Sequence, residues 1–187
     1  MNKQIIAATV AACLVAAGCL LLTQPAAAAQ SANVEVAFSP DGGAERLVLH
    51  TVEGAQHSIR VMAYAFTAPA VVRALILAKR RGVDVAVTVD YRSNIEDDRS
   101  GRARAALASL VYAGIPVRTV RVYALQHSKF LVADQNIVET GSYNYTQQAA
   151  RYNSENALVM SGNAAIAAAY LSNWNTVTAQ GQSYPAP

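Results

Sequence analysis

The chain has 187 residues, of which 53% are hydrophobic, and its formal net charge at pH 7 is +3. This length suggests one domain, and the charge is too small to identify a nucleic-acid-binding protein without knowing how it is distributed. Both cysteines, Cys13 and Cys19, lie near the N-terminus. The rest of the chain therefore has no disulfide framework and no thiolate ligand for a metal.

The first 29 residues are typical of an export signal. A lysine near the start is followed by a long apolar run over residues 5–22 and by four alanines over residues 26–29, which suit a cleavage site. We therefore expect residues 1–29 to be a signal peptide and residues 30–187 to form one exported domain, periplasmic or secreted. Two alternatives stay open, namely an uncleaved membrane anchor through residues 5–22 and a lipoprotein attached at Cys19.

Strand-like and helix-like runs alternate along the rest of the chain. The predicted strands are 34–38, 58–66, 84–89, 115–120, 130–133, 137–139 and 157–160. The predicted helices are 44–53, a helix capped by Thr67 and ending before Gly82, 101–112 and 164–178. The alternation favours an α/β fold with a mixed, mostly buried β-sheet sandwiched between helices, followed by a loose tail over 179–187.

A polar and densely charged segment, residues 90–104, follows the end of one predicted strand, where α/β folds place their ligand loops. It sets four arginines against three consecutive acidic residues: Arg92, Arg99, Arg102 and Arg104 against Glu96, Asp97 and Asp98. One interpretation is a mobile loop that binds a phosphate backbone, with Arg92 and Arg102 as substrate-binding residues. The other is a solvated loop with internal ion pairs.

The most informative stretch is residues 126–144, QHSKFLVADQNIVETGSYN. It contains H-x-K-x4-D, formed by His127, Lys129 and Asp134, and then G-S-x-N, which includes Ser142 and Asn144. In an extended strand the side chains alternate between faces, so His127 and Lys129 point the same way, about 7 Å apart along the chain. A nucleophile or proton donor beside a fixed cation is what attack on a phosphodiester requires.

These motifs resemble those of the phospholipase D superfamily. The resemblance extends to the segments AYAFTAP, AKRRGVDV, GIPVRT and NSENALV. A single motif in a short chain is most similar to the small bacterial Nuc-type endonucleases, whereas larger members of the superfamily carry two copies. The resemblance implies the phospholipase D/nuclease fold and one catalytic domain over residues 30–187.

The resemblance also implies six site residues: His127, Lys129, Asp134, Ser142, Asn144 and Glu155. The histidine attacks phosphorus and forms a phosphohistidine. The lysine and the asparagine hold the phosphoryl oxygens, with the serine close by. The glutamate hydrogen-bonds a histidine ring and fixes its tautomer, and the aspartate completes the motif but is more structural than catalytic.

Other candidates have less support. His57 repeats the Gln-His-Ser context of His127 but lacks the lysine and the G-S-x-N that follow it. The histidines have no metal-ligand spacing, so we expect no metal and no cofactor. Ser142 lacks the G-x-S-x-G frame of a serine nucleophile. Three tyrosines near the motif either stack on bases or pack structurally: Tyr143, Tyr145 and Tyr152.

A histidine nucleophile needs a second group that protonates the leaving oxygen. Since the chain offers one convincing histidine, a twofold homodimer that brings both copies of His127 to one site is the simplest solution, and the resemblance implies it too. We expect an exported, metal-independent, nonspecific endonuclease whose substrate is DNA, with RNA as a further nucleic-acid substrate. The alternatives are a phospholipase D acting on phosphatidylcholine-type lipids and a non-catalytic nucleic-acid-binding protein.

Overall fold

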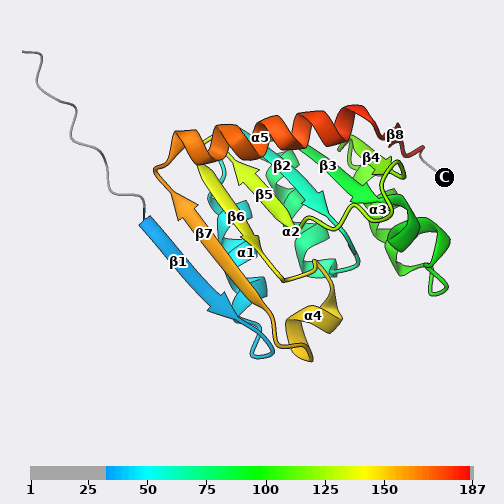
Figure 1. The fold of residues 1–187 in the computed structure, drawn as a ribbon, viewed down its shortest axis with the longest axis horizontal. Coiled ribbons are helices and arrows are strands. Elements are labelled where there is room, and N and C mark those ends of the chain that lie inside the picture. The colour runs from blue at the N-terminus through cyan, green and yellow to red at the C-terminus, as the bar shows by residue number, and fades with distance from the viewer. Residues whose placement is uncertain (1–32, 186–187) are drawn as a thin grey trace, which may run out of the picture.

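The computed structural model describes residues 33–185 (Figure 1). The expected signal peptide over residues 1–29 and its two alternatives, the anchor and the lipoprotein site, lie outside the described residues. Among the residues that are described, no helix is both long enough and apolar enough to cross a membrane.

Strands and helices alternate through most of the chain, and they form a single mixed sheet with helices on both sides. The strands are β1 (Asn33–Phe38), β2 (Ser58–Ala63), β3 (Asp84–Asp90), β4 (Val117–Val120), β5 (Phe130–Ala133), β6 (Ile137–Gly141), β7 (Asn156–Ser161) and β8 (Gln182–Ser183). The helices are α1 (Gly43–Gly54), α2 (Pro69–Arg80), the π-helical segment η1 (Arg92–Glu96), α3 (Arg102–Tyr112), α4 (Gln147–Arg151) and α5 (Ala164–Ala179).

The sheet has eight strands in the order β1-β7-β6-β5-β2-β3-β4-β8. The two adjacent pairs β2–β3 and β3–β4 are parallel, and α2 and α3 lie in the connections between them. The other pairs are antiparallel. Figure 1 shows α5 lying across one face of the sheet, while α1 and α2 lie behind the other. The prediction of a mixed sheet between helices is therefore confirmed.

Two apolar layers fill the space on either side of the sheet. Alternation along β5 sends Leu131 and Ala133 toward the larger layer, under α1, α2 and α3, and Phe130 and Val132 toward the smaller layer, under α5. Trp174 of α5 belongs to the smaller layer and donates a hydrogen bond from Nε1 to the carbonyl of Val61, 3.0 Å away. The sheet is thus buried on both faces over most of its width, which agrees with the prediction of a mostly buried sheet.

Two local expectations were wrong, and one helix was missed. Thr67 does not cap α2, because the N-cap position is Ala68 and no side chain bonds there. Helix α4 was not predicted. The tail was expected to be loose, but β8 pairs with β4, and the amide of Tyr184 donates to the carbonyl of Val117 over 2.9 Å. The guanidinium of Arg118 also donates to the carbonyls of Thr178 and Gly181, which holds the end of α5 against the sheet edge.

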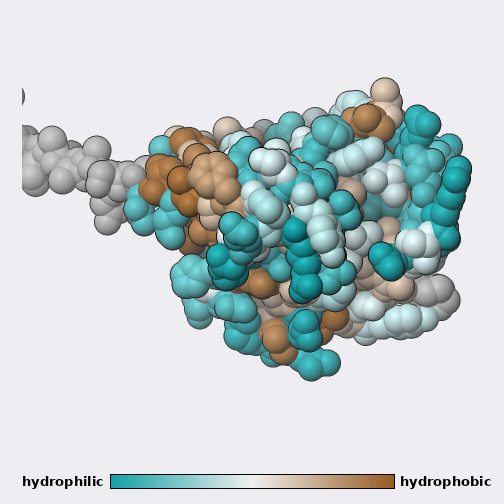
Figure 2. Space-filling model, turned by 90° about the horizontal axis from the view of Figure 1, so that it is seen from below, coloured by the Kyte–Doolittle hydropathy of each residue, from teal (hydrophilic) through white to brown (hydrophobic). Residues whose placement is uncertain are grey.

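One part of the sheet has an exposed apolar surface. Val34, Val36 and Phe38, which alternate along the edge strand β1, are 55%, 57% and 62% exposed. Val36 stands opposite Leu158 of β7, and Leu158 stands opposite Thr140 of β6, so these side chains share one sheet face. Figure 2 shows apolar side chains gathered at the end of the molecule where the described chain begins. We name Val34, Val36 and Phe38 the β1 apolar row.

A buried acid in β6 makes the stability of the fold dependent on pH. Glu139 is 1% exposed, and its carboxylate accepts a 2.6 Å hydrogen bond from the hydroxyl of Tyr145. Burial raises the pKa of Glu139 from 4.5 to about 8, although the bond from Tyr145 acts in the opposite direction. The folded state therefore holds a proton that the unfolded state has already released, so stability falls as the pH rises from about 4.5 toward 8.

We expect Glu139→Gln to remove this pH dependence, because glutamine stays neutral and still accepts a bond from Tyr145. The wild-type free energy of unfolding should fall by about 3 kcal/mol between pH 5 and pH 8 through this group, relative to the variant. Urea denaturation at both pH values measures it. The exposed Glu53→Gln is the control and should keep the wild-type slope. Parallel curves for wild type and Glu139→Gln would contradict a raised pKa at Glu139.

Candidate active site

The sheet register brings four separate chain segments to one edge of the sheet. Met62 of β2 pairs with Phe130 of β5, Phe130 pairs with Thr140 of β6, and Gly141 pairs with Ala157 of β7. Residues just after β2 and β6, and just before β5 and β7, therefore meet. The residues around the start of β5, the end of β6 and the start of β7 line a cavity of about 780 Å³ together with side chains of α5. Its polar lining includes His127, Lys129, Ser142, Asn144, Glu155 and Asn173.

His127 and Lys129 form the centre of this cavity. The ammonium nitrogen of Lys129 lies 2.9 Å from Nδ1 and 3.2 Å from Nε2 of the His127 ring, and it donates to the His127 carbonyl over 2.6 Å. His127 is exposed, whereas Lys129 is 8% exposed. A phosphate that bonded the ammonium would thus lie beside the imidazole. His127 and Lys129 do not meet through alternation along a strand, as the sequence suggested, because β5 begins only at Phe130. Ser128, which lies between them in the chain, also lines the cavity.

The electrostatics of Lys129 are set by burial and by one carboxylate. Partial burial lowers the pKa of Lys129 from its ordinary value of 10.5, and the negative charge of Glu155 opposes that change. The ammonium therefore loses its proton at a lower pH than that of a solvated lysine. Within residues 33–185, no group of three or more His, Cys, Asp and Glu side chains is arranged to hold a metal ion.

The position before Ser142 has room for glycine alone. A side chain at Gly141 would place Cβ 2.2 Å from the carbonyl oxygen of Asn156, so only glycine fits there. The same carbonyl accepts the amides of Ser142 and Tyr143, over 3.1 and 3.2 Å. This close contact between the end of β6 and the start of β7 sets Ser142 beside Glu155.

Glu155 bonds neighbouring side chains rather than the His127 ring of its own chain. Its carboxylate accepts from the hydroxyl of Ser142 over 2.6 Å and from the amide of Asn153 over 2.9 Å. No hydrogen bond within the described chain joins it to His127. A bond from Glu155 to a histidine ring therefore stays a prediction, to be met by the partner subunit or by a rearrangement of this network.

Asn144 presents an unoccupied amide to the cavity. The Asn144 side chain makes no hydrogen bond with any residue in 33–185, and its buried Oδ1 has no partner. Buried polar groups in proteins are nearly always hydrogen-bonded. The amide nitrogen is therefore free to donate to an acceptor such as a phosphoryl oxygen, which is the role predicted for this residue, whereas the buried Oδ1 would need a donor from the ligand.

Asp134 lies at the other end of β5 from Lys129, away from the cavity. With Gln135 it begins the three-residue turn between β5 and β6, and both residues have positive φ, 51° and 58°. Its carboxylate accepts the amides of Gln56, His57 and Ser58 at 2.7–2.9 Å. Burial raises the pKa of Asp134, but these three donors outweigh it and hold the pKa below the ordinary value. Asp134 is a structural residue, and His57 lies beside it at the wrong end for catalysis.

A buried polar network supports the loop that carries His127. The carboxylate of Asp90 accepts the amide of Gln126 over 2.8 Å and that of Ser93 over 2.6 Å. Asn94 of η1 is fully buried, donates to the carbonyl of Tyr64 over 2.6 Å, and accepts the amide of Phe66 over 2.9 Å. The end of β3 thus holds both the His127 loop and the segment after β2 in place.

Sequence reasoning missed Tyr64. Its ring lies 4.4 Å from the His127 ring, measured between centroids, and the Lys129 ammonium lies 5.1 Å from the Tyr64 centroid. Tyr64 therefore packs against both reactive groups and limits the positions that the imidazole can take. The segment AYAFTAP pointed to this region but gave Tyr64 no role. Tyr170 of α5 also lines the cavity and was not anticipated.

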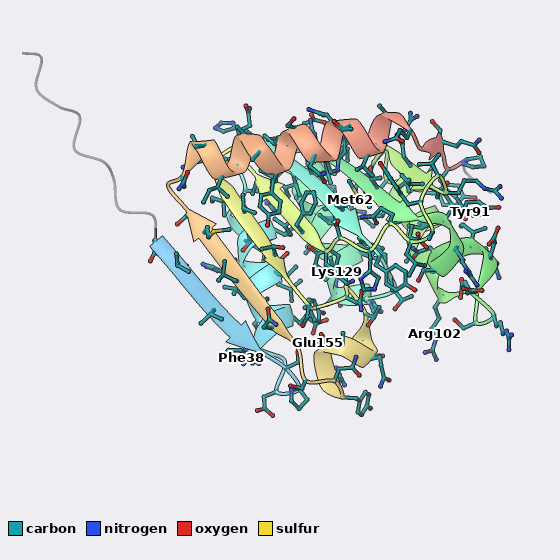
Figure 3. All side chains as sticks on the ribbon, viewed as in Figure 1. Phe38, Met62, Tyr91, Arg102, Lys129 and Glu155 are labelled. Atoms are coloured by element: carbon teal, nitrogen blue, oxygen red, sulfur yellow. The ribbon has the colours of Figure 1, made fainter. Side chains whose placement is uncertain are left out.

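The charged segment over residues 90–104 is folded rather than a mobile arginine loop. It contains η1, and Arg104 donates to the carbonyls of Ile95 and Asp98 over 3.0 and 2.8 Å. Arg92 lies 3.4 Å from Asp97, so the interpretation with internal ion pairs describes it better. Arg102 lines a different cavity from the one around His127. Figure 3 shows Arg102 to the side of Lys129 and Glu155 and pointing away from both.

Of the three tyrosines near the motif, two are structural. Tyr143 and Tyr145 are fully buried in the larger apolar layer, and their rings pack edge to face, with centroids 5.9 Å apart. Base stacking on these two is therefore excluded. Tyr152 is 71% exposed and lines the same cavity as Arg102.

Comparisons with known proteins agree with this geometry. Residues 48–176 match the family described as "Cardiolipin synthase, PLD-like domain". The crystal structure of the phospholipase D family member Nuc from Salmonella typhimurium is 41% identical and superposes with a TM-score of 0.79, covering 82% of this chain and 98% of Nuc.

Two curated relatives are named for lipid substrates. A phospholipase D from Rickettsia prowazekii is 34% identical over 142 residues, which are 76% of this chain and 66% of the relative. The mitochondrial cardiolipin hydrolase of Xenopus laevis is 34% identical over 119 residues, 64% of this chain and 53% of the relative. The chain thus spans about two thirds of the first relative and about half of the second. The matched span, the fold and the 98% coverage of Nuc lead to one conclusion: the chain belongs to the phospholipase D superfamily, with the Nuc-type members.

Proposed function

We propose that this protein is a metal-independent, nonspecific endonuclease that cleaves DNA, and RNA as well, through a phosphohistidine at a site shared by two subunits. The observation that supports it most is the convergence of His127, Lys129, Asn144 and Glu155 on one cavity in a chain 41% identical to Nuc across 98% of that protein. The cavity of about 780 Å³ is open and large enough for a nucleotide-sized group.

The chemistry requires two histidines. A ring nitrogen of His127 in one subunit attacks phosphorus, an N–P bond forms, and the P–O ester bond breaks. His127 of the partner subunit, protonated, gives its proton to the leaving oxygen. The same imidazole, now neutral, then takes a proton from water as the water oxygen bonds phosphorus and the N–P bond breaks. Both copies of Lys129 and Asn144 neutralise and bond the phosphoryl oxygens throughout.

A twofold dimer formed through the sheet face that carries the β1 apolar row supplies this pairing. The β1 apolar row lies on the same sheet face as Thr140, which lines the cavity, and α5 does not cover that part of the face in Figure 1. An exposed apolar strip on the same sheet face as a residue that lines the cavity favours burial against a second copy of the same surface. The interface would then bring the two cavities together.

We further propose that the protein is exported, on the basis of the pattern in residues 1–29 alone. The expected form begins at Gln30. The intact mass of the protein recovered from the periplasm or the medium, compared with that of the full chain, measures the cleavage.

A phospholipase D activity is the second candidate. The Rickettsia and Xenopus relatives are named for lipid hydrolysis, and the β1 apolar row beside the cavity offers a surface for acyl chains. The nuclease is favoured because the chain covers nearly all of Nuc but only part of these relatives. A non-catalytic nucleic-acid-binding protein has less support, because all the residues of the constellation are present.

We expect purified protein to nick plasmid DNA and to degrade RNA at full rate in excess chelator, and to leave phosphatidylcholine and cardiolipin vesicles intact. The reason is that a histidine nucleophile and a lysine supply the charge stabilisation that a metal gives other nucleases. Gel analysis measures the cleavage of DNA and RNA, choline release measures hydrolysis of phosphatidylcholine, and formation of phosphatidic acid measures hydrolysis of both lipids. Activity only after a divalent cation is restored would refute the metal-independent mechanism. Choline release without nicking would establish the second candidate, and DNA binding without any cleavage the third.

A further inference from the structure

A second cavity lies outside the site described above. It is about 950 Å³ in volume and is formed by one side each of α2, α3 and α4. Three guanidiniums line it, those of Arg73 and Arg80 on α2 and Arg102 at the start of α3. We name this cavity the arginine groove.

The charge of the arginine groove is not neutralised. Arg73, Arg80 and Arg102 are exposed, and none of their side chains forms an ion pair or a hydrogen bond within residues 33–185. No acidic residue lines the groove. By contrast, Arg60, Arg92 and Arg121 elsewhere on the surface each lie within 4 Å of a carboxylate. Three unpaired like charges around one hollow attract an anion and raise its local concentration.

Six other lining residues are apolar, and several of the remaining ones suit a nucleotide. Gln147 and Gln148 of α4 offer amide donors and acceptors, and the exposed ring of Tyr152 offers a flat face. Aromatic side chains combined with arginines that follow the backbone are the usual means of binding a single strand without sequence preference.

The groove adjoins the active-site cavity. Asn144 lines the active-site cavity, and Gln147, three residues later, lines the arginine groove. Three residues span at most about 11 Å, so the two cavities lie on either side of one short turn. A strand whose scissile phosphate lies at His127 can therefore continue into the groove.

We propose that the arginine groove is a second binding site, outside the active site, for the sugar-phosphate backbone of a single nucleic-acid strand. Arg73, Arg80 and Arg102 contact successive phosphates, and Tyr152 stacks on a base. The inference rests on the proposed nuclease function for its substrate. It gives Arg102 the substrate-binding role predicted from the sequence, at a place that the sequence did not indicate.

A nucleic-acid strand fits this groove better than a lipid surface does. A membrane is flat, whereas the three arginines surround a hollow whose other polar groups are two amides and the hydroxyls of Thr67, Ser109 and Tyr152. Membrane attachment in soluble enzymes usually adds a broad apolar face to the basic charge. The β1 apolar row, the most evident apolar surface, belongs to the opposite end of the sheet from α3 (Figure 1).

The test compares two triple variants that lose the same charge. The groove variant is Arg73→Gln/Arg80→Gln/Arg102→Gln, and the control is Arg46→Gln/Arg99→Gln/Arg121→Gln, three exposed arginines that do not line the groove. Binding of a labelled 12-nucleotide single strand is measured by fluorescence anisotropy in a His127→Ala background, which prevents cleavage. We expect the magnitude of the negative slope of log K against log salt to decrease by about 2 in the groove variant, since each of the three phosphate contacts contributes about 0.7. The control should keep the parental slope.

A small substrate separates binding from catalysis. With His127 intact, kcat/KM for bis(p-nitrophenyl) phosphate should be the same in the groove variant as in wild type, while kcat/KM for the oligonucleotide falls at least tenfold. Equal salt slopes in the two triple variants would overturn the proposal. So would an equal loss of activity on the small diester, or weaker binding to phosphatidylglycerol vesicles with unchanged oligonucleotide binding. A wild-type enzyme that hydrolyses the small diester but no nucleic acid would refute the proposed function instead. The salt slopes would still show whether the arginine groove binds a nucleic-acid strand.

Discussion

Replacing His127 with alanine should abolish turnover, with a fall in kcat of at least about four orders of magnitude. The change removes the nucleophile from one subunit and the proton donor from the other, and each of these roles is worth several powers of ten. Plasmid nicking and hydrolysis of a small diester measure the loss. His57→Ala is the matched control, because His57 lies beside Asp134 at the far end of β5 and should leave the rate unchanged.

The covalent intermediate can be observed directly. Rapid quenching of the wild-type reaction with a ³²P-labelled substrate should leave label on the protein, stable in alkali and lost in acid, as expected for phosphohistidine. The label should be absent in His127→Ala. A labelled protein whose phosphate maps to another residue would show that the cavity around Lys129 holds the substrate but that a different side chain attacks it.

Mixed dimers distinguish a shared site from two independent ones. A heterodimer of one wild-type and one His127→Ala subunit, isolated with two different tags, holds a single imidazole at the shared site. Its activity should be at least about a hundredfold below that of wild type, since either the nucleophile or the acid is missing. Half of the wild-type activity would mean that each subunit acts alone, and the dimer mechanism would have to be abandoned.

A lysine in the β1 apolar row should separate the subunits and remove activity. Val36→Lys places a charge at the centre of the proposed interface, and the twofold axis makes each dimer carry the change twice. Desolvating an unpaired ammonium costs several kcal/mol. We therefore expect a monomer by analytical ultracentrifugation and at least a hundredfold loss of nicking. The melting behaviour of the monomer should stay nearly normal, because Val36 is 57% exposed within the single chain.

The control for this change is a valine with matched exposure. Val122 is 56% exposed and lies in the loop whose Tyr123 hydroxyl accepts a bond from Gln180, at the far end of α5. Val122→Lys should keep both the native mass and the activity. A Val36→Lys protein that stays dimeric and active would place the interface elsewhere. A Val36→Lys monomer that is fully active would refute the shared site itself.

Much of the fold follows from local patterns in the chain. The near-continuous apolar run at 84–89 and the four residues 130–133 match β3 and β5 closely, because a strand covered on both faces needs apolar side chains at nearly every position. Helix α4 was missed, because it has only five residues and too few to show a helical period. The pairing of β8 was also missed, because a two-residue strand has no pattern of its own.

The part of the site that is local in the sequence was predicted, and the part that depends on strand pairing was not. His127, Lys129, Ser142 and Asn144 lie within 18 residues of one another, so motif spacing alone associates them. Tyr64 and Asp90 are far from this stretch in the chain. They reach it only through the pairing of β2 with β5 and of β2 with β3, which no local pattern specifies. The position of Asp134 at the opposite end of β5 likewise follows from the length of that strand.

By itself, the sequence of this protein determined which groups are available for chemistry: a histidine, a lysine and an asparagine at spacings that suit a phosphoryl group. Only the tertiary structure decided where the charges act. The carboxylate of Glu155 bonds Ser142, the carboxylate of Asp90 supports the His127 loop, and three arginines from two helices surround one hollow. The reason is that chemical reactivity depends on residue type, which can be read from the sequence. Electrostatic coupling depends instead on distances of a few ångströms, and only strand register and helix packing bring the coupled residues that close.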